Sequence, residues 1–143
     1  MQGSQQIVVG VDGSEASLQA LREARTLAES LGCTLKAVTA WEMPVTAAEY
    51  PYRLEYNFQD DAREQLDEAL RTAFGDDRPR GLETEVRQGP PARVLRDLGE
   101  GARMVVVGSR GRGGFAGLLL GSVSSAVAAH ATCPVLITHR SKD

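Results

Sequence analysis

The sequence predicts an α/β fold in which an open, five-stranded parallel sheet is covered by helices on both faces. Five short apolar segments typical of strands alternate with four longer segments whose apolar residues recur at helical spacing. The strand-like segments lack strict alternation of polar and apolar residues, which indicates burial on both faces. We therefore expect right-handed crossovers between parallel strands.

The first βα unit consists of a predicted strand at residues 7–11 and a helix at residues 15–31. Ser14 precedes the helix as an N-cap, and Gly32 follows it as a C-terminal stop. Apolar residues recur along this helix at a spacing that gives it one buried face. They are Leu18, Leu21, Ala24, Ala28 and Leu31.

The middle of the chain repeats this pattern twice. Residues 35–41 predict a second strand, and a second helix is expected from residue 56 or 57 to residue 74. Residues 82–86 predict a third strand, and Pro91 takes the first position of a short third helix. The apolar residues of that helix are Val94, Leu95 and Leu98.

The last third of the chain contains a fourth and a fifth predicted strand. Residues 104–107 are continuously apolar, and residues 122–131 carry small and apolar residues at helical spacing. Pro134 ends this helix, and residues 135–138 form the last predicted strand.

Length and composition favour one soluble globular domain, residues 1–143. The chain is 42% hydrophobic and 24% charged, and no apolar run approaches the roughly 20 residues that span a bilayer. We therefore expect a cytoplasmic protein that does not bind membranes. The net charge of -3 gives no general attraction to nucleic acid, so none is expected as a partner.

The two cysteines, Cys33 and Cys133, are too few for a disulfide framework and lack the spacing of metal ligands. We expect both to be reduced and buried.

Glycine residues gather where the fourth predicted strand ends. Gly108 and Gly111 are followed by Gly121 and Ser122, at the start of the last helix. Such glycines let backbone N–H groups approach a phosphate, and a helix N-terminus adds favourable partial charge. Ligands of open parallel sheets bind where the winding reverses, so the first strand's end, with Asp12, is expected to face this loop.

Four motifs carry a resemblance to a known family, and the match extends over residues 7–138. They are the G-x2-G-x9-G-S pattern from Gly108 to Ser122, Val9-Gly10-Val11-Asp12-Gly13-Ser14, Gly89-Pro90-Pro91 and Cys133-Pro134-Val135-Leu136. Together they resemble a universal stress protein domain, and the glycine pattern is similar to that of the ATP-binding subgroup. The resemblance implies the adenine-nucleotide α-hydrolase-like fold with strand order 3-2-1-4-5, bound ATP and a homodimer.

The family pattern assigns Asp12 to the ribose and triphosphate region of the nucleotide. A carboxylate there would repel phosphate, so a Mg²⁺ or Mn²⁺ ion shared between the two is chemically sensible. The alternative is that Asp12, Gly13 and Ser14 form only a turn and a helix cap.

The resemblance implies further contacts with the nucleotide. Ala40 contributes backbone groups that read the adenine edge, and free N–H groups at the start of the last helix point at the phosphates. Arg110 contacts phosphate oxygens or is simply solvated. The complete set of expected binding residues, besides Asp12, is Gly10, Val11, Ala40, Val107, Gly108, Arg110, Gly111, Gly121, Ser122 and Val123.

No catalytic residues are assigned. The sequence has no Walker loop, no kinase-like set and no readable pairing of a cysteine or serine with a histidine. We therefore expect a nucleotide-responsive regulatory or stress-survival module. The alternatives are a weak ATPase or phosphoryl-transfer enzyme, and a nucleotide-free dimeric scaffold. The dimer is expected to form through residues 135–138, an apolar edge strand.

Overall fold

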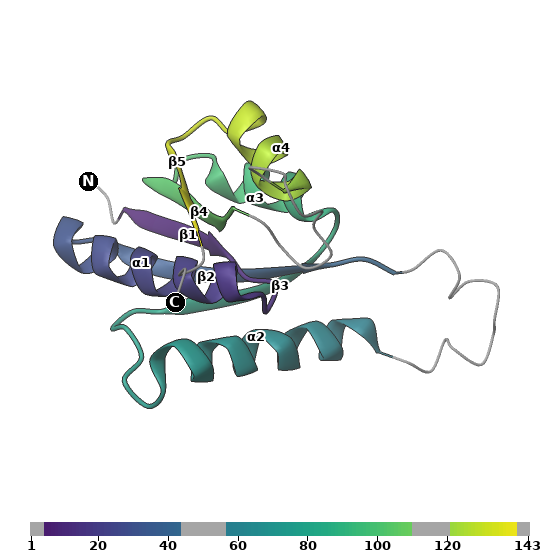
Figure 1. Cartoon of the computed structure of the whole chain (residues 1–143), viewed down its shortest axis with the longest axis horizontal. Coiled ribbons are helices and arrows are strands. Elements are labelled where there is room, and N and C mark those ends of the chain that lie inside the picture. Colours follow the sequence, from purple (N-terminus) through teal and green to yellow (C-terminus); the bar gives the residue numbers. More distant parts are fainter. Residues whose placement is uncertain (1–4, 44–56, 110–120, 140–143) are drawn as a thin grey trace.

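The computed structural model describes residues 5–43, 57–109 and 121–139. Strands and helices alternate along them, as the sequence predicts (Figure 1). The elements are β1 (Gln6–Gly10), α1 (Glu15–Leu31), β2 (Thr34–Trp41), α2 (Phe58–Phe74), β3 (Glu83–Gln88), α3 (Pro91–Gly99), β4 (Met104–Gly108), α4 (Ser122–His130) and β5 (Val135–Thr138).

The strands form one parallel sheet in the order β3-β2-β1-β4-β5, which confirms the expected order. Val9 at the centre lies between Ala37 of β2 and Val106 of β4. The chain first moves outward from β1 to β3 and then returns to the other side of β1. The winding therefore reverses between β1 and β4, the position at which open sheets of this kind bind ligands.

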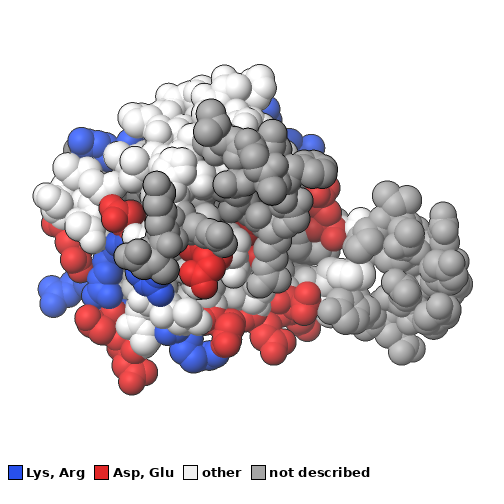
Figure 2. Space-filling model, in the orientation of Figure 1, with Lys and Arg blue, Asp and Glu red and all other residues white. Residues whose placement is uncertain are grey.

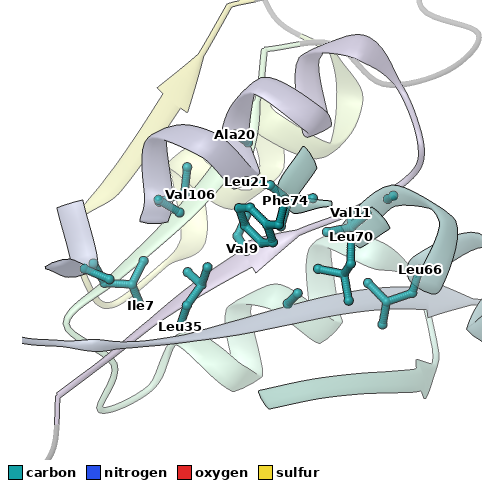
Figure 3. Close-up of a cluster of buried hydrophobic side chains, with 14 residues drawn as sticks. Ile7, Val9, Val11, Ala20, Leu21, Leu35, Leu66, Leu70, Phe74 and Val106 are labelled. Carbon is teal, nitrogen blue, oxygen red and sulfur yellow. The ribbon is translucent and has the colours of Figure 1, made fainter. Parts of the chain in front are cut away.

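Helices α1 and α2 cover one face of the sheet, and α3 and α4 cover the other (Figure 1). Ile7 and Val9 point to α1 and α2, where they pack with Leu21 and Leu70 (Figure 3). Val8, between them in the sequence, belongs to the second cluster, beneath α3 and α4. This two-sided burial explains why residues 7–9 of β1 are all apolar.

The predicted ends of α1 and α2 are confirmed. The Ser14 hydroxyl accepts a hydrogen bond from the Ser17 N–H at 3.2 Å, and Gly32 adopts φ 70° as the C-cap of α1. The Asn57 side chain caps α2 by accepting from the Asp60 N–H at 3.0 Å. These caps satisfy backbone groups that a helix end leaves unpaired.

The third strand lies slightly later in the chain than expected. Gly81 adopts φ 78°, and the Leu82 N–H donates to the carbonyl of Pro79, so Leu82 belongs to a turn. Pairing with β2 then runs from Glu83, opposite Lys36, to Gln88, opposite Trp41. The pairing partner, rather than the apolar pattern, sets the limits of β3.

The expectation of buried cysteines is wrong. Cys33 and Cys133 are both free, but each is only partly buried, because each lies in a connection next to a strand rather than within the sheet. Burial still raises the pKa of the Cys133 thiol. Among the described residues, no helix is long and apolar enough to cross a membrane.

Candidate functional site

A cleft opens at the carboxyl ends of β1, β2 and β4, where the winding of the sheet reverses. The cleft is partly open to solvent. Its lining residues are Gly10, Val11, Asp12, Ser14, Ser17, Val38, Ala40, Pro91, Leu95, Val107, Gly108, Val123 and Ser124. The segments predicted to converge, one following β1 and one following β4, therefore meet in one cleft.

The cleft combines an apolar wall with a group of polar side chains. Val38 of β2, together with Pro91 and Leu95 of α3, contributes apolar surface. The polar side chains are those of Asp12, Ser14, Ser17 and Ser124, at the start of α1 and of α4. An apolar slot with a few convergent polar groups is typical of small-molecule sites.

Three helices, α1, α3 and α4, present their N-terminal turns to the cleft. The Ser14 side chain caps α1. The N-cap residues of α3 and α4, Pro90 and Gly121, provide no side-chain hydrogen bond. Helix N-termini carry partial positive charge and favour anions. The cleft is therefore electrostatically suited to a ligand with a negatively charged group.

The segment that carries Asp12 is held by hydrogen bonds from three elements. One Asp12 carboxylate oxygen accepts from the Ser14 N–H at 2.9 Å, and Gly13 adopts φ 82° between the two. The Thr39 hydroxyl of β2 donates to the Val11 carbonyl at 3.0 Å, and the Gln65 amide of α2 donates to the Asp12 carbonyl at 3.1 Å. Asp12 thus stabilises the local turn and also lines the cleft, so the two predicted roles are compatible.

Gly108 is required by the packing of α1. A Cβ atom at Gly108 would lie 2.7 Å from the Cβ and 2.8 Å from the carbonyl carbon of Ala16. The sequence interpretation, that Gly108 lets the chain approach a ligand, therefore misses the contact that the structure shows. Gly10 differs, because its added Cβ would meet the end of the Leu95 side chain at 2.8 Å.

The start of α4 differs in part from the prediction. The Gly121 N–H donates to the Ser109 carbonyl at 2.6 Å, so the expectation of a free N–H group at Gly121 is wrong. The same carbonyl accepts the Ser124 hydroxyl at 2.7 Å, and the Ser109 N–H donates to the carbonyl of Thr138 at 2.6 Å. Ser109 therefore joins α4 to the end of β5.

The structure brings most of the predicted binding residues that it describes to the cleft. Those that line it are Gly10, Val11, Asp12, Ala40, Val107, Gly108 and Val123. Gly121 and Ser122 lie at the start of α4 and do not line the cleft, and Ser122 is exposed. Arg110 and Gly111 lie outside the described residues.

Sequence reasoning did not assign Ser17, Val38, Pro91, Leu95 or Ser124 to the site, although all line the cleft. Pro91 carried a usable signal. It follows Gly89 and Pro90 at the carboxyl end of β3 and begins α3, one of the helices whose first turn reaches a ligand site in parallel sheets.

Comparison with known proteins now assigns the family. The Universal stress protein family profile matches residues 3–139. The chain belongs to this family. It is 38% identical over 136 residues to Universal stress protein Rv2623 of Mycobacterium tuberculosis, an alignment that covers 94% of this chain and 45% of that protein. The chain thus spans about half the length of the curated relatives that it matches.

Two solved structures of universal stress proteins show which ligands similar proteins hold. One, in complex with cAMP, is 31% identical, has a TM-score of 0.62, and is matched over 98% of this chain and 100% of its own. The other, from Archaeoglobus fulgidus in complex with dAMP, is 23% identical with a TM-score of 0.63, over 94% and 97% of the two chains. Both ligands are adenine nucleotides, and the second structure supports the fold alone.

Proposed function

We propose that this universal stress protein binds ATP in the cleft and acts as a nucleotide-responsive regulatory module. The observation that carries the proposal is that one cleft has both an apolar slot, beside Val38, Pro91 and Leu95, and helix N-termini that favour anions. The adenine ring suits the apolar slot, and the phosphates suit the N-terminal turns. The cAMP complex of a relative supports an adenine nucleotide as the ligand class.

The proposed contacts come from residues that line the cleft and from the start of α4. The backbone at Val11 and Ala40 faces the adenosine, Gly108 borders the ribose, and Val123 contributes an N–H group to the phosphates. Ser122, at the first position of α4, is proposed to contribute its N–H group as well. Arg110 and Gly111 remain proposed phosphate contacts from sequence alone.

Asp12 is proposed either to accept hydrogen bonds from the ribose hydroxyls or to bind a Mg²⁺ or Mn²⁺ ion that accompanies the nucleotide. Asp12 lines the cleft, and a hard divalent cation prefers carboxylate oxygen ligands. Within the described ranges, no group of three or more His, Cys, Asp or Glu side chains fits a metal ion. Phosphate oxygens of the nucleotide would be further ligands of a cation at Asp12.

Calorimetric titration with ATP in the presence of Mg²⁺ tests the proposal. Wild-type protein is expected to bind, and Asp12→Asn is expected to weaken binding about tenfold, since hydrogen bonds to charged groups are the stronger ones. Asp97→Asn, an exposed carboxylate on α3 that does not line the cleft, is the matched control. Wild-type protein that binds no adenine nucleotide would instead favour the nucleotide-free dimeric scaffold.

Measuring the rate at which product is released from labelled ATP distinguishes the enzyme alternative from a binding module. A binding module is expected to turn over far more slowly than roughly once per second, the low end of ordinary enzyme rates. Faster turnover would favour an ATPase or a phosphoryl-transfer enzyme.

A further inference from the structure

Gln65 of α2 contacts the Asp12 segment from outside the cleft. Its side-chain amide donates to the Asp12 carbonyl at 3.1 Å, across 53 positions of the sequence. Gln65 lines the groove between α1 and α2 rather than the nucleotide cleft. Any effect of Gln65 on a ligand in the cleft must therefore pass through the protein.

The contacted peptide is the one that needs an external restraint. Gly13 follows Asp12 at φ 82°, and glycine adopts negative φ values about as readily as positive ones. The Asp12–Gly13 peptide is thus less restricted than its neighbours. The φ angle of Gly13 helps to place the Ser14 N–H, which donates to the Asp12 carboxylate at 2.9 Å.

The surroundings of Gln65 favour a neutral donor at this position. The acidic residues that line the groove are Asp61, Glu64, Asp67 and Glu68, and Arg71, which also lines it, forms an ion pair with Glu68. Figure 2 shows acidic side chains, with basic ones among them, low in the view, where α2 runs in Figure 1. A carboxylate in place of the amide would lose the donor and add negative charge beside the Asp12 carbonyl.

We propose that Gln65 is a positioning residue for the nucleotide site, because its amide fixes the Asp12–Gly13 peptide and thereby holds Asp12, which lines the cleft, in place. The inference rests on the proposed function of the cleft. Gln65 touches no ligand itself and contributes to nucleotide affinity only through Asp12.

A double-mutant cycle on ATP affinity in Mg²⁺ tests this role. Gln65→Ala is expected to weaken binding about fivefold, the equivalent of one lost hydrogen bond, and Gln65→Glu is expected to weaken it more. In the Asp12→Asn background, Gln65→Ala is expected to have no further effect, because the group it positions is already lost. Gln59→Ala, an exposed glutamine of the same helix, is the control and should bind like wild type.

The outcomes separate the inference from the function on which it rests. If Gln65→Ala binds like wild type, or lowers affinity equally with and without Asp12, the positioning role is wrong while the nucleotide site stands. If wild-type protein binds no adenine nucleotide, the proposed function fails. In that case amide hydrogen exchange tests whether Gln65 fixes the Asp12–Gly13 peptide. Gln65→Ala should speed exchange of the Ser14 N–H, and unchanged exchange would overturn the positioning role.

Discussion

Gly108, at the end of β4, lies directly against Ala16 in the first turn of α1, so closely that a Cβ atom would lie 2.7 Å from the Cβ of Ala16. The contact joins the two segments that border the cleft, although they are far apart in the sequence. It sets the distance between the end of β4 and the helix that follows Asp12.

Replacing Gly108 with alanine is expected to destabilise the protein by about 1–3 kcal/mol. The added methyl group meets the carbonyl carbon of Ala16 at 2.8 Å, and backbone cannot move aside as a side chain can. Urea unfolding measures the loss. Gly10→Ala is the matched comparison and should cost less, because the atom it meets is the flexible end of Leu95. A Gly108→Ala variant as stable as wild type would contradict this account.

Thr39→Val is expected to lower stability by about 1–2 kcal/mol. The Thr39 side chain is buried, and its hydroxyl donates to the Val11 carbonyl at 3.0 Å, which the valine leaves unpaired. Thermal unfolding should show a clear fall in Tm. Thr72→Val removes a comparable hydroxyl contact on the exposed face of α2 and should change stability by less than about 0.5 kcal/mol. Equal effects of the two substitutions would argue against a special role for Thr39.

Glu85 is expected to make stability depend on pH at the acid end. Burial raises the pKa of its carboxyl group, but hydrogen bonds and charges from Lys36, at 2.7 Å, and from Arg87 outweigh burial and lower the pKa below its ordinary 4.5. The stabilisation is therefore complete above about pH 5 and is lost as the pH falls through the lowered pKa.

Chemical unfolding of wild type and Glu85→Gln between pH 3 and pH 7 checks this expectation. The difference in free energy of unfolding should stay constant at neutral pH and shrink toward pH 3. Glu83→Gln, at an exposed position of the same strand, should show no such change. A difference that grows on acidification would have the wrong sign.

A homodimer through β5 remains a prediction. The strand β5 is an edge of the sheet and carries the uncharged residues Val135 to Thr138, whereas the opposite edge, β3, carries Glu83, Glu85 and Arg87. Charged edge strands resist pairing, so association is expected at β5. Sedimentation at micromolar concentration should show a dimer that dissociates on dilution. A monomer at every concentration would remove this prediction.

The parallel sheet with helices on both faces was predictable because it follows from rules that act on whole segments, whereas its strand order was implied by the family resemblance. Continuously apolar strands such as β1, alternating with helices, require a parallel sheet, and parallel strands end at one edge. That is why Asp12 and Gly108, distant in the sequence, were expected at one place. The contacts of individual side chains do not follow from such rules.

Leu95 and Gln65 illustrate what the sequence leaves open. Each lies on a helix whose spacing predicts which residues face the sheet, but not which of them reaches the cleft or a neighbouring loop. The bond from Gly121 to Ser109 joins the two ends of a connection, and no local pattern encodes it. Gly108 was singled out in the sequence because it is a glycine in a glycine-rich segment, but the structural reason for a glycine there is the close packing of α1.

Chemical-shift mapping with ATP and Mg²⁺ on isotopically labelled protein tests the central claim most directly. The account predicts that the largest shifts occur at the backbone amides of Gly10, Asp12, Ala40, Gly108 and Val123, which line one cleft but come from four places in the chain. Shifts confined to the groove between α1 and α2, or none at millimolar ATP, would contradict it.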